Sequence, residues 1–159
     1  MDPLLKVLAS DASLSLVEIA DMLGLSESET RSRLRQLVAD QLVLGYRAIL
    51  NEEKLGRELV RAVIEVRITP ERGGGFDKLA ERIAKYAEVR SCHLMSGGYD
   101  LLVEVEGKNL REVATFVSEK LSTIQGVLST ATHFVLRAYK EQGVLMKHEI
   151  SEERLAVTP

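Results

Sequence analysis

The sequence contains few aromatic residues and no tryptophan. Aromatic residues make up 4% of the 159 positions, whereas 45% of the positions are hydrophobic. The core is therefore expected to be aliphatic, and a platform of aromatic side chains that stacks single-stranded DNA or RNA is not expected. Charged residues make up 28% of the chain, a balance typical of globular proteins and not of disordered ones.

Cysteine is also scarce, because Cys92 is the only one in the chain. A single cysteine cannot form an internal disulfide, and its place in a strand pattern favours a small buried hydrophobe. No stretch resembles a signal peptide, and no apolar run approaches the length that spans a membrane. We therefore expect a cytoplasmic protein with no membrane partner.

An excess of positive charge is likewise missing. The net charge is −3, and residues 1–58 hold seven Lys or Arg against ten Asp or Glu, which is again −3. Bulk charge therefore gives no support for nucleic-acid binding. Such binding would have to depend on basic side chains clustered on one face.

Signals that begin and end helices fill the first forty residues. Asp2 and Pro3 form a cap followed by proline at the first helical position. Residues 15–18 and 26–29 each match a capping box, and Gly24 between them ends a helix. Two capped helices joined by a short glycine turn predict a helix-turn-helix, with a generic helical hairpin as the alternative.

The second helix of this pair is the one expected to enter the DNA major groove. Its inward positions are Thr30, Leu34 and Leu37. Its outward polar residues are the candidate DNA contacts: Ser28, Arg31 and Ser32 for base edges, Arg35 for phosphate, and the cap residue Ser26. Arg33 is expected instead to fold over the domain and pair with an acidic residue.

Residues 42–51 are β-rich and include Gly45 as a turn residue, which predicts a small wing. Arg47 on this wing is a candidate contact to the DNA backbone. Three helices followed by a wing predict a winged helix-turn-helix domain over residues 1–58.

The rest of the chain alternates strand and helix patterns. The predicted elements are a strand at 61–68, a helix at 76–87, a hairpin at 89–105, a helix at 109–126 and a strand at 128–139. The second helix is expected to bury Leu110, Val113, Ala114, Val117, Leu121 and Ile124. The order βαββαβ is typical of a ferredoxin-like sandwich with both helices on one face of the sheet.

The predicted fold is therefore α+β, with the winged domain joined to a ferredoxin-like sandwich at residues 59–140. The tail at 141–159 is expected to add a hairpin, built from 143–146 and 154–157, or a swapped arm. The strands read as fairly apolar on both sides, so the uncovered sheet face is expected to pack against a second copy.

The turn of the central hairpin, at residues 96–100, is unusually rich in chemistry. It combines Gly97 and Gly98 with a serine, a tyrosine and the carboxylate of Asp100. Two glycines suit a tight turn, and they also leave room for a ligand to approach the backbone. The turn is either a plain hairpin with polar edges or a small-molecule site.

Taken together, these residues resemble the Lrp/AsnC family of transcriptional regulators from about Leu4 to Tyr139. The helix at 25–37 and the segment 43–46 match the family's recognition helix and wing entry. Val89, Cys92 and the turn at 96–100 match its V-x-x-C…G-x-Y-D signature, and residues 127–132 match the next strand. The chain departs from the family at Glu27, where proline is common, and acidic charge there opposes DNA.

The resemblance implies a function and a set of partners. Such proteins bind double-stranded DNA at pseudo-palindromic promoter sites and form homodimers that assemble to tetramers or octamers. Their effectors, amino acids or related metabolites, bind where dimers meet. On this chain the resemblance implies an effector site made of the amides of Ser96, Gly97 and Gly98, with Tyr99, Asp100, Thr130 and Thr132. Asp100 would face an ammonium group or only brace the turn.

Two other classes of protein remain as alternatives. One is a metabolite-sensing assembly module without DNA binding. The other is a decarboxylase-type enzyme of the same architecture, although no nucleophile, base and orienting residue form a recognisable set. His93 and His133 alternate out of register with the neighbouring cysteine and threonines, and no metal-binding spacing is present. We therefore expect a protein that is not an enzyme and has no cofactor, metal or catalytic residue.

Overall fold

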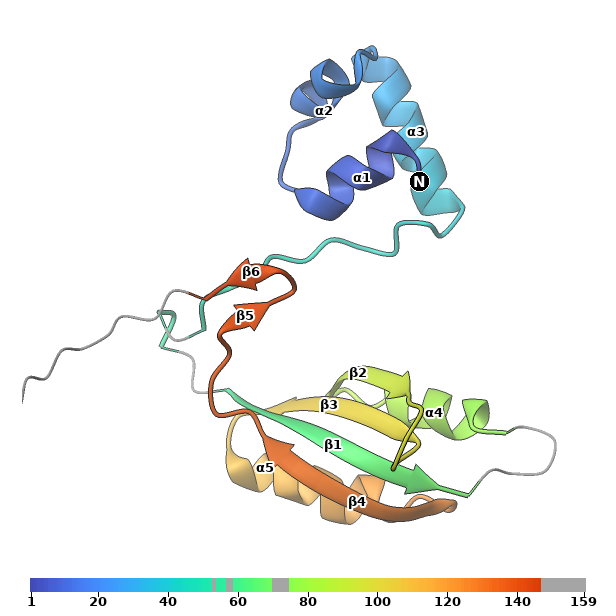
Figure 1. Cartoon of the computed structure of the whole chain (residues 1–159), viewed down its shortest axis with the longest axis vertical. Helices are drawn as coiled ribbons and strands as arrows, with labels where there is room; N and C mark the ends of the chain where they lie inside the picture. The colour runs from blue at the N-terminus through green and yellow to red at the C-terminus, as the bar shows by residue number, and fades with distance from the viewer. Residues whose placement is uncertain (53, 57–58, 70–74, 147–159) are drawn as a thin grey trace, which may run out of the picture. The chain divides into compact units, whose positions relative to one another are not determined.

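The computed structural model describes residues 1–52, 54–56, 59–69 and 75–146. Contacts divide the chain between Ala48 and Ile49 into two compact units, a helical unit and a sheet unit. Each unit has its own hydrophobic core. Figure 1 shows the helices of the first unit and the sheet of the second.

The helical unit contains α1 (Pro3–Ser10), α2 (Leu16–Leu23) and α3 (Glu27–Ala39). Asp2 caps α1 by accepting the Leu4 N–H, and Gly24 ends α2 in the left-handed conformation with φ of 64°. Both predictions are confirmed. The unit closes over a small core of Leu4, Ile19 and Leu37. The helix-turn-helix is therefore formed by α2 and α3.

The two predicted capping boxes have different outcomes. Ser15 and Glu18 form the full reciprocal pair, and the hydrogen bond from the Ser15 hydroxyl lowers the pKa of the Glu18 carboxyl. At α3, Ser26 accepts the Glu29 N–H at 3.2 Å, but the Glu29 carboxylate lies 3.9 Å from Arg33. The Glu29 side chain therefore turns along the helix toward an arginine, as was expected for Arg33.

The strand predicted in residues 42–51 is not formed in the described chain, where residues 43–50 have no regular structure. A strand needs a neighbour to accept and donate its ladder hydrogen bonds, and no described strand pairs with this segment. The segment is rich in β-forming residues, but this composition alone does not provide a partner strand.

The sheet unit contains an antiparallel sheet of four strands in the order β2-β3-β1-β4 (Figure 1). The strands are β1 (Val60–Ile68), β2 (Val89–Leu94), β3 (Leu101–Gly107) and β4 (Val127–Phe134). The helical layer holds α4 (Asp77–Ala84), α5 (Leu110–Thr115) and the π-helical turn η1 (Phe116–Leu121). This element order is the predicted ferredoxin-like βαββαβ arrangement.

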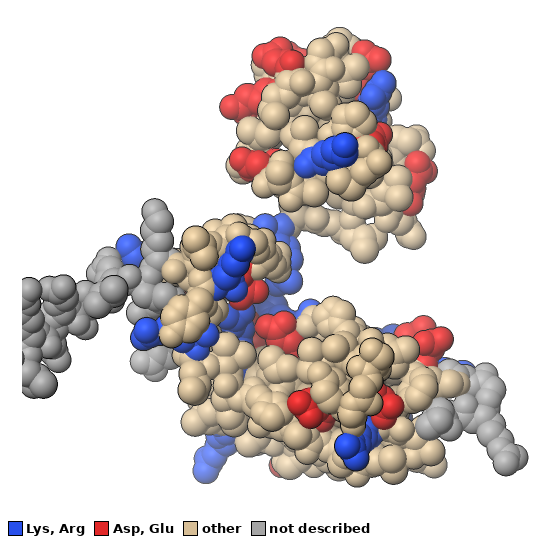
Figure 2. Space-filling view, viewed as in Figure 1, with Lys and Arg blue, Asp and Glu red and all other residues tan. Residues whose placement is uncertain are grey.

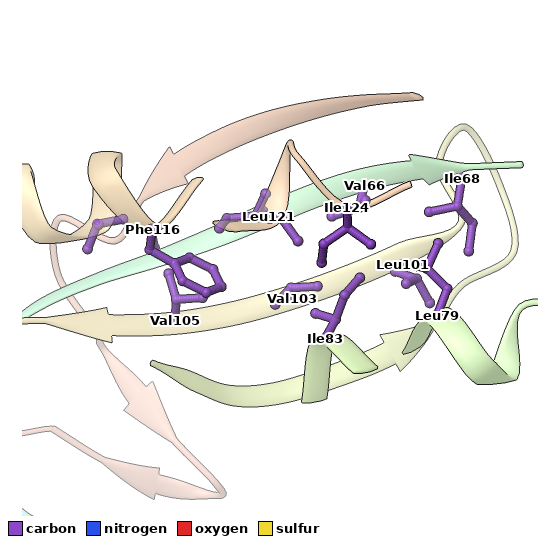
Figure 3. Packing of buried hydrophobic residues seen from close by; sticks show 13 residues of the cluster. Val66, Ile68, Leu79, Ile83, Leu101, Val103, Val105, Phe116, Leu121 and Ile124 are labelled. Carbon is purple, nitrogen blue, oxygen red and sulfur yellow. The ribbon is translucent and has the colours of Figure 1, made fainter. Parts of the chain in front are cut away.

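The core lies between one face of the sheet and the helices. Ile64 and Val66 of β1 and Val103 of β3 are fully buried against Ile83 of α4 and Phe116 of η1. Figure 3 shows these aliphatic side chains converging from both layers. The expectation of a mainly aliphatic core is confirmed, with Phe116 buried in it and Phe76 and Tyr86 packed against it.

The helical segment formed by α5 and η1 departs in part from the predicted pattern of buried residues. Leu110 is 58% exposed and Ala114 is also exposed, whereas Phe116 is buried. The two misses lie before the π turn, whereas the predicted positions Val113, Val117, Leu121 and Ile124 lie in or against the core as expected. Two predicted elements also end early: α4 ends at Ala84, and β4 ends at Phe134.

The uncovered face of the sheet is polar, so the prediction of an apolar second face is wrong. Only Val63, Leu102 and Ala131 are apolar among the residues that the strand register places there. Several of its polar groups are paired: Arg61 lies 3.8 Å from Glu104, Arg90 bonds Glu106, and His133 lies 3.4 Å from Glu65. The prediction gave too little weight to the charged residues that alternate with apolar ones along these strands.

Both edge strands contain one extra residue in their pairing. In β2 the register shifts between Val89 and Ser91, which leaves Arg90 without an opposite residue. In β4 the partners of Arg67 and Ile68 are Ser129 and Val127, which leaves Leu128 bulged. The sheet is therefore regular in its two central strands and irregular at both edges.

A short hairpin follows the sheet, formed by β5 (Lys140–Glu141) and β6 (Val144–Leu145). Glu141 connects it to the sheet through Arg61 at 3.1 Å. A hairpin was expected in the tail, but its arms here are 140–141 and 144–145. The predicted second arm at 154–157 lies outside the described residues.

Candidate functional site

Helix α3 presents one polar face to solvent. Ser28, Arg31, Ser32 and Arg35 are spaced at i, i+3, i+4 and i+7, so they share a face, and all four are exposed. The opposite face is held in the helical unit by Thr30 and Leu37. Thr30 is fully buried, and its hydroxyl donates to the Ser26 carbonyl at 3.0 Å. The outward face of α3 is therefore positioned by buried contacts on its other side.

The arginines of α3 differ in their partners. Arg33 lies 3.9 Å from Glu29, whereas Arg31 and Arg35 have no carboxylate within 4 Å among the described residues. Two uncommitted guanidinium groups one turn apart suit phosphate oxygens or guanine edges. This local arrangement can bind DNA although the helical unit mixes acidic and basic side chains on its visible surface (Figure 2).

The remaining predicted DNA contacts lie at the margins of this face. The Ser26 hydroxyl caps α3 and lies 3.1 Å from the Ser28 hydroxyl, so the cap is already engaged in the free protein. Glu27 and Glu29 occupy the first turn of α3. Arg47 is exposed in the extended segment after the helices.

The hairpin turn of the sheet unit is held to β1 by Asp100. The Asp100 carboxylate accepts the Ile68 N–H at 2.8 Å, and its own N–H donates to the Val66 carbonyl at 3.0 Å. The Met95 N–H closes the turn by donating to the Asp100 carbonyl at 2.8 Å. Asp100 therefore braces the turn, and this accounts for one of its two carboxylate oxygens.

The tip of the turn offers backbone donors. Ser96, Gly97 and Gly98 are exposed, and their N–H groups donate to no acceptor within the described residues. Gly97 has φ of 136° with open space where a side chain would begin. Successive free amides of this kind can hold an anion such as a carboxylate. Tyr99 is half-buried beside them.

Thr130 and Thr132 do not join the turn within one chain. They pair with Val66 and Ile64, whose side chains face the helices, so both threonines point to the helical side of the sheet. The Thr130 hydroxyl lies 3.5 Å from that of Ser122. The predicted effector residues therefore divide into the turn at 96–100 and a separate pair on β4.

One residue near the turn was missed. The Arg67 Nε donates to the Gly98 carbonyl at 2.8 Å, which links the end of β1 to the turn tip. Alternation along the strand had placed Arg67 on the outward face, and that was the available signal. Nothing in the local pattern indicated a contact between residues 31 positions apart.

A cavity of about 560 Å³ lies elsewhere in the sheet unit, lined by Glu88, Gly107, Arg111, Phe116 and Lys120 among others. Gly107 ends β3, whereas the turn at 96–100 precedes that strand, so the cavity and the turn are at different ends of β3. Two of its charged residues are paired with each other, since Lys120 bonds Glu88. None of the predicted site residues lines it.

The cysteine and histidine side chains that an enzyme could use for catalysis do not form one cluster. Cys92 is half-buried against the core with its sulfur 3.9 Å from the Ala80 carbonyl, and burial raises the pKa of its thiol. His93 and His133 lie on the uncovered face of the sheet. Their chain neighbours Cys92 and Thr132 lie on the other face, as predicted. Within the described residues no three potential metal ligands cluster, and no helix there has the length and apolarity to cross a bilayer.

Comparison with known proteins assigns both units. Residues 3–38 match the AsnC-type helix-turn-helix domain, and residues 61–145 match the Lrp/AsnC ligand binding domain. An HTH-type transcriptional regulator of Bacillus subtilis, YugG, is 40% identical, covering 98% of this chain and 95% of its own length. A proline dehydrogenase transcriptional activator of Rhizobium radiobacter is 31% identical, covering 89% and 90%.

Solved structures agree. A transcriptional regulator of Neisseria meningitidis in complex with L-methionine has a TM-score of 0.70 at 29% identity, covering 91% of this chain and 96% of that one. The leucine response regulatory protein of Mycobacterium tuberculosis has a TM-score of 0.72 at 26% identity, covering 92% and 100%. With the helix-turn-helix, the sheet and the turn in their places, the chain belongs to the Lrp/AsnC family and is a DNA-binding transcriptional regulator with a ligand-binding domain.

Proposed function

We propose that this regulator responds to an amino acid or a closely related carboxylate. In this proposal residues 1–58 bind DNA, residues 59–140 bind the effector and mediate assembly, and the tail at 141–159 is an accessory segment. The observation that carries it is the set of three exposed, uncommitted amides at Ser96 to Gly98. The L-methionine complex of the Neisseria regulator supports an amino acid as the ligand class.

On the DNA side, the exposed face of α3 is the proposed contact. Arg31 and Arg35 have uncommitted guanidinium groups, and Ser28 and Ser32 lie on the same face. Paired recognition helices of a dimer would read a pseudo-palindromic site. Arg47 would contact the DNA backbone beside the groove, and Ser26 would contribute through its backbone rather than its engaged hydroxyl.

The first experiment tests the DNA contact. Duplexes selected from a random pool are bound by the wild type, by Arg31→Ala with Arg35→Ala, and by Arg33→Ala as a matched control. Each lost phosphate contact is expected to lower the slope of log affinity against log salt by about 1. The double variant should show that loss and Arg33→Ala should not. If both variants lowered the salt slope equally, the proposal that this face of α3 contacts DNA would be wrong.

The second experiment tests the effector class. Thermal unfolding and sedimentation are measured with each of the twenty amino acids in turn. A ligand that binds only the folded state raises the unfolding midpoint as its concentration rises. At a hundred times its Kd, it raises the free energy of unfolding by about 2.7 kcal/mol. A single responding amino acid that also changes sedimentation supports a switch in assembly. A flat response across the whole set would exclude a free amino acid as effector.

Self-association is proposed on the extended segment after α3. Leu42, Leu44 and Tyr46 alternate along it and are 61%, 89% and 53% exposed. Alternating apolar side chains on an unpaired extended segment favour pairing with a second copy of the same segment. The basic assembly in this proposal is a homodimer, and dimers associate further where the effector turns meet.

The alternative considered from the sequence, a sensor without DNA binding, has in its favour only the acidic residues in the first turn of α3. The DNA experiment separates the two. A bare sensor, like a decarboxylase-type enzyme of this architecture, would select no duplex and show no salt dependence.

A further inference from the structure

Arg67 occupies a distinctive position at the end of β1. It belongs to the uncovered sheet face, it is exposed, and its Nε donates to the Gly98 carbonyl at 2.8 Å. A guanidinium group has five N–H donors in a planar fork, and this hydrogen bond uses only one of them. The other four form no hydrogen bond with the described residues.

The neighbouring arginines on this face are committed to glutamates. Arg61 lies 3.1 Å from Glu141 and 3.8 Å from Glu104, and Arg90 bonds Glu106. Arg67 has no carboxylate within 4 Å among the described residues. Its charge is therefore available to an anion that comes from outside the chain.

The surroundings of Arg67 also favour an anion. The amides of Ser96, Gly97 and Gly98 are uncommitted, and the Arg67 hydrogen bond reaches the carbonyl of that same segment. The nearby Asp100 carboxylate is itself negative and opposes an anion, but one of its oxygens is bound to the Ile68 N–H. A planar fork beside free amides matches the two oxygens of a carboxylate, and charge-assisted pairs of this kind are stronger than neutral ones.

We propose that Arg67 determines specificity for a carboxylate at the effector turn, by binding that group together with the turn amides. This inference rests on the proposed effector site and adds the residue that recognises charge there. Ligands with a free carboxylate would be selected over their amides, because an amide places an N–H against the guanidinium.

The simplest competing role is that Arg67 only braces the turn through Gly98. A probe that does not depend on the identity of the effector separates the two roles. The full chain is labelled with ¹⁵N-glycine and titrated with acetate, and Gly97 and Gly98 are assigned by single alanine substitutions. Acetate is expected to shift both signals in the wild type, to leave them unmoved in Arg67→Gln, and to shift them normally in Arg90→Gln, the control arginine on the same face.

The second measurement compares an acid with its amide. L-methionine and L-methioninamide are titrated against wild type, Arg67→Lys and Arg67→Gln. Arg67→Gln is expected to weaken L-methionine binding about ten- to a hundredfold, the range for a hydrogen bond to a charged group, and to leave L-methioninamide unchanged. Arg67→Lys should retain part of the preference, because it keeps the charge and loses the fork.

The outcomes distinguish this inference from the proposed function. Acetate that does not shift the turn glycines, or shifts them equally in Arg67→Gln, overturns the role of Arg67 whatever the amino-acid panel shows. Equal weakening of the acid and the amide also overturns it, because a brace affects both alike. Acetate binding that requires Arg67, with no amino acid active in the panel, supports the carboxylate site and removes the amino acid as effector.

Discussion

At the scale of single residues, Asp100 has a structural role that does not depend on any ligand. Its carboxylate accepts the N–H of Ile68, a residue that is 4% exposed and belongs to the core. Without that acceptor the Ile68 N–H loses its partner in a partly buried place. The bracing role of Asp100 is therefore confirmed, and its contact with a ligand through the second oxygen stays a prediction.

Replacing Asp100 by Ala is expected to destabilise the sheet unit by about 1–3 kcal/mol, the cost of an unsatisfied buried donor. Asp100→Asn keeps an acceptor oxygen and should retain most of that stability. Urea unfolding of both variants measures the difference. If Asp100→Ala unfolded at the same urea concentration as the wild type, the hydrogen bond to Ile68 would contribute nothing to stability.

The turn illustrates what sequence predicts about a site. The glycines and Asp100 were identified because their residue types suit a tight turn, and this chemistry is local. The contact of Arg67 with Gly98 depends on two segments meeting across the sheet, which local patterns do not encode. Thr130 and Thr132 were grouped with the turn by resemblance, and the register separates them from it within one chain.

At the scale of elements, the helical segment after β3 buries Phe116 of the π turn η1, a residue that the sequence pattern did not place in the core. Phe116 is 2% exposed and packs edge-on against Tyr86, with ring centroids 5.6 Å apart. Helix caps and strand alternation were predicted well because each is a short-range rule. The regular pattern placed Val117, Leu121 and Ile124 correctly, and it failed at Leu110 and Ala114, which precede the π turn and are exposed.

Phe116→Ala is therefore expected to cost about 3–5 kcal/mol, as large-to-small changes in a core do. Leu110→Ala is the matched control, since Leu110 is 58% exposed, and should change stability by less than about 0.5 kcal/mol. Chemical denaturation of the two variants tests the register of the helix directly. A larger effect of Leu110→Ala would restore the regular helical pattern.

At the scale of the whole molecule, self-association depends on surfaces that a single chain leaves open. The segment at 43–50 has the composition of a strand and no strand partner in the described chain. Sequence predicted its β character, but a strand also needs a partner, which composition does not reveal. The misread sheet face has a different cause, since its charged residues alternate visibly along the strands.

Replacing Leu44 and Tyr46 together by Ser is expected to shift sedimentation toward smaller species, since it removes apolar side chains that are 89% and 53% exposed. Met22→Ser is the control, because Met22 is a 63% exposed apolar residue on α2. Sedimentation velocity over a range of protein concentrations provides the measurement. An unchanged distribution in the double variant would place the interface elsewhere.

The bulges at Arg90 and Leu128 have a consequence for how the protein behaves when crowded. An unpaired strand edge is a template on which another chain can add a strand, and this is a common route to aggregates and fibrils. Both outer strands of this sheet carry an extra residue that twists the edge and interrupts its row of donors and acceptors. The extra residues at both edges therefore disfavour growth of the sheet by addition of strands from further copies.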